Sequence, residues 1–333
     1  MKTIAFFNNM GGVGKTSLVF HLAWMFRRLG LSIVALDLDP QSNLTSAFLP
    51  ESRLAEMWED EGARRTVFGS VRPSLERAGD VDAPHVEAIE SDLFSPDLGL
   101  VPGDLGLASC EDRLAETWPR CLESSWSDVE DGFRVTTAFH RVARSAAEAT
   151  GANLVLIDVG PSLGAINRAA LVASDYIVVP LAADLFSIHG LQSLGPTLRA
   201  WRRDWAIRKN EAVVPRLGLS LPGGGMSPIG YVMLEHAVRR DLWARRVPSA
   251  YRTHVLDQPI GPQAPSTDPH LLGTIRHYRN LMPMAQQRRK PMFELTPADG
   301  AFGGHAAAVL DCREAFEKLA RRIAGACGIT LPS

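Results

Sequence analysis

The sequence predicts an α/β fold in which a doubly wound, mostly parallel sheet carries helices on both of its faces. Short apolar segments rich in β-branched residues alternate with segments whose apolar residues recur every three or four positions. At the start of the chain a strand, a glycine-rich turn, a helix and a second strand follow one another, which forms a βαβ unit. Because a parallel sheet needs helices on both faces, this alternation favours the doubly wound arrangement.

The individual strands and helices follow from local apolar patterns. Residues 3–7 are predicted to form the first strand and residues 33–36 the second. Between them, apolar residues recur at helical spacing from Lys15 onward, and Gly30 is predicted to stop this helix. A crossover helix is expected at residues 166–173. Four further strands are expected where short apolar runs end in turn-forming residues, at residues 98–101, 154–157, 176–179 and 230–234.

The chain is interpreted as a single domain that covers residues 1–333. Its length of 333 residues and its hydrophobic content of 46% are sufficient for one large core. Residues 51–132 are rich in acids and poor in strand signals, which predicts an elaboration of helices and loops. Their acids favour a solvated face, and a binding face for a basic partner is the alternative. Residues 199–260 are expected to form an arginine-rich surface region.

Charge and cysteine usage exclude several classes of function. The formal net charge of −2 gives no overall basic field, so any contact with nucleic acid or membrane would have to be local. The four cysteines, at positions 110, 121, 312 and 327, form no CxxC pair, which indicates neither a zinc knuckle nor a redox dithiol. A reduced, cytoplasmic protein is therefore expected.

No membrane association is expected. The chain lacks the long apolar core of a signal peptide, and it has no apolar run long enough to span a bilayer. Residues 309–324 are predicted to form an amphipathic helix with Leu310, Phe316, Leu319 and Ile323 on its apolar face. Its basic residues would suit a membrane surface, but the short and interrupted apolar stripe favours packing against the sheet.

The strongest chemical signal is the glycine-rich segment between the first strand and the following helix. Its glycines let backbone amides turn inward around phosphate oxygens, and the helix N-terminus adds a partial positive charge. Lys15 is expected to reach the β- and γ-phosphates of ATP, and the Thr16 hydroxyl is expected to ligate Mg²⁺. A standard loop would have a further glycine where Asn9 stands. The nucleotide-binding residues are predicted to be Gly11, Gly12, Val13, Gly14, Lys15, Thr16 and Ser17.

Two acidic segments complete the predicted site. Asp37 and Asp39 follow the second strand, and ligands of doubly wound sheets bind at the carboxyl ends of the strands. One of these carboxylates could hold the hydration shell of Mg²⁺, and the other could orient an attacking water. Four apolar residues precede Asp158, which is the form of a Walker B strand whose acid reaches Mg²⁺ through water. The Gly-Pro pair at 160–161 could then sense a γ-phosphate.

Together, these segments resemble the ParA/MinD group of deviant Walker ATPases, and the ParA branch most closely. Residues 98–107 are also similar to the strand that precedes the central helices of this family. The resemblance covers most of the chain, and residues 51–97 and the last third match least. The segments that carry it are residues 9–16, 37–43, 156–164, 175–180 and 190–191.

The resemblance implies a P-loop ATPase that binds ATP with Mg²⁺ and closes into a face-to-face homodimer. Hydrolysis would be weak and would depend on a ParB-like or other activating partner. Lys15 matches the catalytic lysine that binds phosphate, and Asp39 matches the aspartate that activates water. With the acid of the Walker B strand included, the predicted Mg²⁺ ligands are Thr16, Asp39 and Asp158. ParA members in the ATP state bind DNA without sequence preference and position plasmids, chromosomes or protein cargo, so association with the nucleoid is compatible with a cytoplasmic location.

The chain departs from the family pattern at Met10. The signature lysine of the family stands just before the two glycines and reaches the phosphate of the partner subunit, whereas methionine offers neither charge nor donor. Loss of one charge-assisted contact of this kind costs about 1.5–3 kcal/mol. The alternative function is therefore a regulator or scaffold that senses ATP and barely hydrolyses it.

Two metabolic relatives on the same fold are disfavoured. A nitrogenase-reductase type would need cluster-binding cysteines after the Walker B strand, but Cys110 and Cys121 lie in the elaborated segment. An ATP-dependent carboxylate ligase would need a dedicated substrate pocket, and no residues in the sequence specify one. Measured turnover of a small-molecule acceptor would revive that second interpretation.

Local basic charge supports binding to the DNA backbone. Eleven arginines and lysines lie between positions 199 and 252, and only four acids oppose them. Such an uneven surface suits salt-dependent contact with phosphates in any sequence, and a solvated helical face is an equally weighted alternative. The residues predicted to contact DNA are Arg239, Arg240, Arg245 and Arg246.

Overall fold

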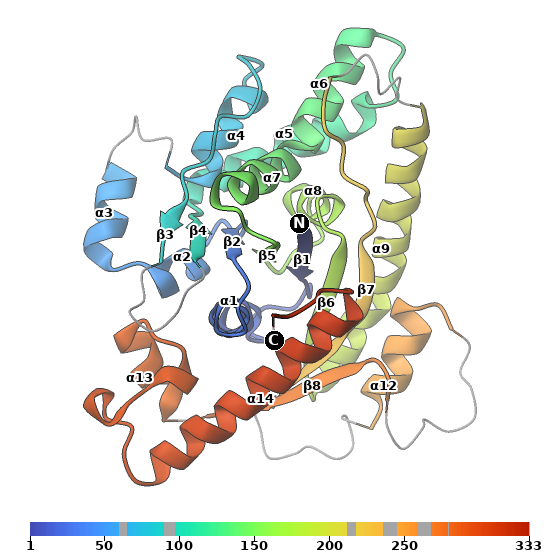
Figure 1. The fold of residues 1–333 in the computed structure, drawn as a ribbon. Helices are drawn as coiled ribbons and strands as arrows, with labels where there is room; N and C mark the ends of the chain where they lie inside the picture. The colour runs from blue at the N-terminus through green and yellow to red at the C-terminus, as the bar shows by residue number, and fades with distance from the viewer. Residues whose placement is uncertain are drawn as a thin grey trace.

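The computed structural model describes residues 1–59, 65–89, 97–211, 218–235, 245–258, 268–278 and 280–332 (Figure 1). Within these residues, eight strands form one sheet in the order β3-β4-β2-β5-β1-β6-β7-β8. All neighbouring strands are parallel except β3 and β4, which run antiparallel. The strands are β1 (Lys2–Phe6), β2 (Ile33–Asp37), β3 (Glu87–Ala88), β4 (Leu98–Val101), β5 (Leu154–Asp158), β6 (Tyr176–Ala182), β7 (Ser227–Glu235) and β8 (Leu271–Arg276).

Helices cover both faces of this sheet, as Figure 1 shows. The short helical turns are η1 (Leu105–Ser109), η2 (Tyr251–Val255), η3 (Met292–Glu294) and η4 (Pro297–Asp299). The α-helices are α1 (Lys15–Arg28), α2 (Asn43–Phe48), α3 (Glu51–Glu59), α4 (Val67–Leu75), α5 (Cys110–Arg120), α6 (Trp126–Thr136), α7 (Ala138–Thr150), α8 (Ala165–Val172), α9 (Leu185–Glu211), α12 (Val247–Ala250), α13 (Leu281–Arg288) and α14 (Gly304–Ala326). The predicted doubly wound, mostly parallel α/β fold is therefore confirmed.

Two apolar cores lie on opposite faces of the sheet because successive side chains of a strand point to opposite sides. In β5, Val155 and Ile157 join the core beneath α4 to α9, whereas Leu154 and Leu156 join the core beneath α1, α2, α13 and α14. All four side chains are fully buried. This burial on both faces explains why the central strands read as continuous apolar runs in the sequence.

All six predicted strands are present, but the sequence reasoning missed β3 and β8. Strand β3 has only two residues and no apolar run, so no local signal marks it. In β8, Gly273 interrupts the apolar pattern, and an added Cβ there would lie 3.2 Å from Leu319 of α14. The glycine that weakens the strand signal therefore permits the close approach of a helix from the end of the chain.

The C-terminal helix packs against the body of the protein, as the apolar stripe predicted. Phe316, Leu319 and Ile323 are buried against β8 and α1, but Leu310 is 57% exposed, so its predicted place on the buried face was wrong. The buried stripe begins instead at Val309. Arg322 donates a 3.0 Å hydrogen bond to the Leu271 carbonyl, which ties the basic side of the helix to the sheet. Among the helices that the structure describes, none has the length and apolar character needed to cross a bilayer.

The acids of segment 51–132 pair with arginines of the same chain. Asp131 forms ion pairs with Arg77 and Arg113, at 2.9 and 2.6 Å. Asp80 receives a 2.9 Å contact from Arg141, whose side chain is buried. These internal partners neutralise the two acids, so neither belongs to an uncompensated acidic surface. Two further acids of this segment, at positions 60 and 61, lie outside the described part of the chain.

Candidate functional site

Three adjacent strands bring the predicted site segments to one edge of the sheet. Strand β5 lies between β1 and β2, and its last residue, Asp158, is in register with both Phe6 of β1 and Asp37 of β2. The glycine loop follows β1, and the acidic turn follows β2. Because parallel strands end at the same edge, segments far apart in sequence meet there. The meeting predicted from the sequence is therefore present in the fold.

The glycine loop turns directly into α1. Gly14 caps this helix in the left-handed conformation, with φ of 86°, which an L side chain rarely adopts. Lys15 folds back over the loop, and its ammonium donates a 3.0 Å hydrogen bond to the Met10 carbonyl. Asn8 fixes the start of the loop, since its Oδ1 accepts a 3.0 Å hydrogen bond from the Met10 amide. The loop is thus closed around the lysine side chain.

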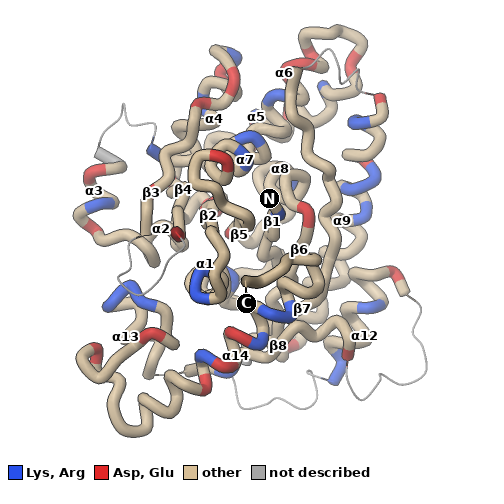
Figure 2. Tube along the Cα trace, in the orientation of Figure 1, with Lys and Arg blue, Asp and Glu red and all other residues tan. Residues whose placement is uncertain are grey.

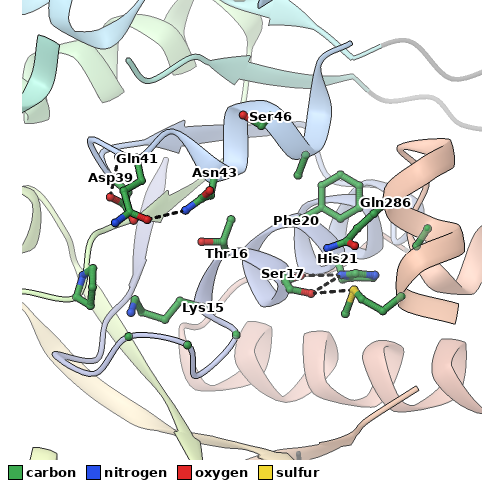
Figure 3. Close-up of a pocket in the computed structure, with 17 residues that line it drawn as sticks. Lys15, Thr16, Ser17, Phe20, His21, Asp39, Gln41, Asn43, Ser46 and Gln286 are labelled. Atoms are coloured by element: carbon green, nitrogen blue, oxygen red, sulfur yellow. Dashed lines mark hydrogen bonds between the residues drawn. The ribbon is translucent and has the colours of Figure 1, made fainter. Parts of the chain in front are cut away.

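A cavity of about 650 Å³ opens beside this loop. In Figure 3, Lys15 and Thr16 lie toward one end, and Phe20, His21 and Gln286 lie toward the other. The volume lies within the range of small-ligand and cofactor pockets. The residues that line it are Gly11, Gly12, Gly14, Lys15, Thr16, Ser17, Phe20, His21, Asp39, Gln41, Asn43, Ser46, Ala47, Pro161, Met282, Ala285 and Gln286.

Most of the predicted binding residues line the cavity, with two differences. The Val13 side chain is only 6% exposed and does not line the cavity, so it contributes to packing. Asp158 does not line it either and lies fully buried. Among the predicted catalytic residues, both Lys15 and Asp39 are at the cavity wall. The structure therefore separates a group of cavity-lining residues from one buried carboxylate.

The buried carboxylate of Asp158 has no hydrogen-bond partner of good geometry on either oxygen among the described residues. Burial, followed by the neighbouring charge of Asp37, raises the pKa of Asp158 well above its usual range, and the Thr16 hydroxyl and the Lys15 ammonium oppose this shift. An unpaired buried carboxylate is costly unless a cation or a water compensates it. Asp158 is therefore suited to hold the hydration shell of a divalent cation.

The donor set near Asp158 fits Mg²⁺ bound together with phosphate. The described residues contain no cluster of three or more His, Cys, Asp or Glu side chains that could hold a metal ion. Thr16 offers a hydroxyl, while Asp39 and Asp158 offer carboxylates. Mg²⁺ characteristically takes one or two carboxylates, several waters and substrate phosphates. A site completed by a nucleotide matches this preference better than an all-protein cage.

The two acids after β2 have different environments. Asp37 is fully buried, and its Oδ2 accepts hydrogen bonds from the Thr45 amide and hydroxyl at 2.8 and 2.7 Å. Burial raises the pKa of Asp37 to about 6, against the effect of the Thr45 hydrogen bonds. Asp39 instead faces the cavity, with its Oδ1 accepting a 3.0 Å hydrogen bond from the Gln41 amide. Asp37 thus anchors α2, and Asp39 is the acid available to a ligand.

The pKa of Lys15 is lowered overall, because the effect of burial outweighs that of the nearby carboxylates. Burial lowers the pKa of Lys15, whereas the carboxylates of Asp158 and Asp39 raise it. The side chain is only 7% exposed. A buried cation held between two acids is well placed to meet an anionic ligand, because a phosphate would replace a neutral carbonyl as its partner.

The sequence reasoning missed the C-terminal wall of the cavity and the histidine that fixes it. His21 Nε2 accepts a 3.1 Å hydrogen bond from the Met292 amide, so Nδ1 carries the proton and donates to the Ser17 carbonyl at 2.7 Å. Helix α13 then supplies Met282 and Gln286 to the cavity. The i, i+4 spacing of Ser17 and His21 was the one local signal available. The contribution of α13 had none, because it arises from packing between the two ends of the chain.

Several arginines of the arginine-rich region form hydrogen bonds within the chain, which the sequence did not indicate. Basic residues mark α9 in Figure 2, but several of them bind backbone carbonyls of the same chain. Arg199 donates to the His254 carbonyl at 2.7 Å, and Arg208 donates to the Trp118 carbonyl at 2.9 Å. Arg245 is exposed at the approach to α12, next to Arg246. The other two predicted DNA contacts, Arg239 and Arg240, lie outside the described residues.

The glycine loop lies at the carboxyl ends of the parallel strands, and acidic side chains face it. This arrangement defines a nucleotide-binding protein of the P-loop class. A family model described as an AAA domain, AAA_31, matches residues 1–211, and the chain belongs to this family. Its curated relatives include partition ATPases, so it is a ParA/MinD-type P-loop ATPase.

Three comparisons illustrate this relationship. The chain is 29% identical over 207 residues to the chromosome partitioning protein ParA of Caulobacter vibrioides, which covers 61% of this chain and 64% of the relative. The structure of protein DIP2308 from Corynebacterium diphtheriae is 26% identical, with a TM-score of 0.71 and 98% of each chain covered. The pNOB8 ParA structure, bound to nonspecific DNA, is 17% identical with a TM-score of 0.58 over 97% of this chain and 99% of that chain, and shows likeness of fold.

The matches to curated relatives are partial in length. They span between 42% and 65% of the length of these relatives. The family model, by its range of residues 1–211, covers the glycine loop and the acidic segments of this chain. The fold comparison with the Corynebacterium protein, by contrast, extends over 98% of the chain.

Proposed function

We propose that this protein binds ATP with Mg²⁺ and forms a nucleotide-dependent homodimer that positions DNA or cargo. The observation that carries the proposal is the pairing of a buried lysine at the cavity wall with an unpartnered buried carboxylate behind it. A buried lysine and a buried carboxyl group that has no hydrogen-bond partner of good geometry match a ligand that brings both phosphate and a metal ion. We also propose a cytoplasmic location, at the nucleoid when DNA is bound.

In this proposal, the residues of the chain divide the work at the phosphates. The loop amides from Gly11 to Gly14 and the Lys15 ammonium would bind phosphate oxygens, and Mg²⁺ would be held by Thr16, with Asp39 and Asp158 contacting its shell. Bound Mg²⁺ supplies charge neutralisation between the phosphates. Asp39 lies on the cavity wall and would orient the attacking water, because phosphoryl transfer depends mainly on positioning and charge.

The open side of the loop supports a face-to-face dimer. Gly11 and Gly12 are exposed. Two large apolar side chains in the segments that follow β5 and β6 are also exposed, Leu163 at 38% and Phe186 at 68%. Leu163 belongs to the loop that supplies Pro161 to the cavity. A second copy would cover these apolar groups together with the phosphates.

A second candidate function is an ATP sensor with little turnover, and Met10 favours it. Met10 occupies the position of the signature lysine, and its carbonyl is already engaged by Lys15. A methionine side chain has no charge to offer a partner's phosphate. Dimer closure would then depend on the exposed apolar side chains of Leu163 and Phe186, and hydrolysis would be slow.

DNA binding belongs to this proposal through Arg245 and Arg246, with Arg239 and Arg240 as further contacts. A relative with the same fold is described as bound to nonspecific DNA. An activating partner, of the ParB type or another, would accelerate hydrolysis in the DNA-bound state.

Sedimentation with Mg²⁺ and ADP, ATP or a slowly hydrolysed ATP analogue tests the proposal. We expect a monomer with ADP and a dimer with ATP or the analogue, and the Lys15→Ala variant should remain monomeric throughout. A monomer under every condition would refute the nucleotide-dependent dimer. Measured ATP turnover with and without DNA then separates the ATPase from the sensor, because a sensor would stay inactive in both.

A further inference from the structure

The loop that follows β5 is held from behind by a glutamate of another helix. Glu111 on α5 accepts a 2.5 Å hydrogen bond from the Ala165 amide and a 3.0 Å hydrogen bond from the Ile166 amide. These amides are the first two of α8 and have no partner within their own helix. The carboxylate therefore satisfies two orphan donors at once and compensates the positive end of the helix.

The contact is so close that a side chain at position 164 would have to displace the carboxylate. A Cβ added to Gly164 would lie 2.4 Å from Glu111 Oε1, a distance that real side chains do not adopt. Asn167 secures the same loop from inside, since its Nδ2 donates hydrogen bonds of 2.7 Å to both the Gly160 and Ser162 carbonyls. The base of the loop is thus fixed at several points.

The tip of this loop faces the cavity. Pro161 lines the cavity, and a Cβ added to Gly160 would lie 3.3 Å from Asp39 Oδ1. The loop therefore approaches Asp39 at its tip and Glu111 of α5 at its base. A shift at its base would move its tip relative to any ligand beside Asp39.

Helix α5 is itself held by the neighbouring helices α8 and α9 on the same face of the sheet. Arg168 of α8 donates a 3.1 Å hydrogen bond to the Leu114 carbonyl, and its guanidinium lies 4.5 Å from the centre of the Trp118 ring. Arg208 of α9 lies 4.0 Å from the same ring. Trp118 therefore contacts two guanidinium groups, which helps to fix the helix that carries Glu111.

We propose that Glu111 is a positioning residue that sets the preference of the site for ATP over ADP. It holds the loop of residues 160–164 in the conformation whose tip meets the terminal phosphate of ATP, a group that ADP lacks. The inference rests on the proposed nucleotide binding and deepens it. Loss of the carboxylate would leave two amides unpaired, so the loop would relax and the contact unique to ATP would weaken.

Calorimetry with Mg²⁺ and each nucleotide tests this role in the Glu111→Gln variant. We expect the ratio of ADP to ATP dissociation constants to fall roughly fivefold or more, the lower end of typical coupling between sites. The affinity for ADP itself should change less than the affinity for ATP. Asp112→Asn, at the neighbouring and exposed position of α5, is the matched control and should leave the ratio unchanged.

A second variant approaches the same contact from the other side. Gly164→Ala should displace the carboxylate and lower the ratio as Glu111→Gln does, but it should add little when combined with Glu111→Ala, which has already removed the group it displaces. Amide exchange at Ala165 and Ile166 should be slow in the wild type and fast in Glu111→Ala, which leaves no side-chain acceptor for these amides.

The outcomes distinguish the two proposals. If the wild type binds nucleotides but the ratio is the same in Glu111→Gln and Glu111→Ala as in the wild type, the positioning role is refuted and the proposed function stands. If the wild type binds neither nucleotide, the proposed function fails, and the role of Glu111 fails with it even where the exchange pattern is as expected.

Discussion

The ammonium of Lys15 donates a 3.0 Å hydrogen bond to the carbonyl oxygen of Met10. The Met10 carbonyl therefore occupies the ammonium group that we expect to bind phosphate. The lysine is buried, and burial lowers its pKa, while the acids Asp158 and Asp39 oppose this shift. A phosphate entering the loop would exchange a neutral acceptor for an anionic one. This relationship links the two loop positions that matter most for the function we propose.

Lys15→Ala should weaken ATP binding by about tenfold to 100-fold, because hydrogen bonds to charged groups contribute about 1.5–3 kcal/mol. Isothermal calorimetry with Mg²⁺ measures this directly. Lys318→Ala, which removes an exposed lysine on α14, is the control and should bind as the wild type does. Equal affinities in the two variants would exclude Lys15 from the site.

Asp39→Ala should retain ATP binding but abolish any hydrolysis, because the residue lies on the cavity wall and would orient the attacking water. Phosphate release at saturating ATP is the measurement. Asp37→Ala is an instructive comparison: it should mainly lower the free energy of unfolding, since Thr45 would lose its acceptor. Unchanged turnover in Asp39→Ala would contradict its assigned role.

Met10→Lys should raise the rate of ATP turnover or lengthen the lifetime of the dimer. The introduced ammonium could reach a partner's phosphate, and a contact of this kind is worth about 1.5–3 kcal/mol. Met10→Leu preserves size without charge and should behave as the wild type. Turnover and sedimentation that match the Met10→Leu control would mean that another residue already performs this task.

Acid should destabilise the protein through His21. Burial lowers the pKa of His21 to about 4 from an ordinary value of 6.5, so the unfolded chain binds the proton more readily between these values. Stability is therefore retained above pH 6.5 and lost as the pH falls toward 4, by about 2 kcal/mol between pH 7 and pH 5. Urea unfolding of His21→Gln across this range should show a shallower decline, although His140 contributes in the same direction. An identical slope in the variant would show that His21 does not titrate as stated.

Arg245→Ala combined with Arg246→Ala should weaken binding to random-sequence DNA and reduce the slope of log affinity against log salt by roughly 2, about one unit for each phosphate that is no longer neutralised. Fluorescence anisotropy with ATP present gives both quantities. Arg321→Ala removes an arginine that pairs with Glu317 on α14, and it should leave the slope unchanged. An equal salt dependence of DNA binding in the double variant and in Arg321→Ala would mean that Arg245 and Arg246 do not form the DNA-binding surface.

Local sequence was sufficient for the parts of the site that depend on a strand and the turn directly after it. The glycine loop, Lys15, Thr16 and Asp39 lie where the βαβ pattern predicts, because a strand delivers the next few residues to the edge of the sheet. The apolar runs were strong enough to place six strands. The pattern also placed Asp158 at the end of its strand, but not its complete burial or its unpaired oxygens.

The sequence by itself determined the class of the fold, the phosphate loop and its acids, because each is a short-range pattern imposed by backbone geometry. Only the tertiary structure decided that α13 walls the cavity, that Asp37 is an anchor while Asp39 faces the cavity, and that Glu111 caps α8 from 54 residues away. These relationships join segments distant in the chain. Their physical cause is packing and the need to satisfy buried polar groups, which no local periodicity records.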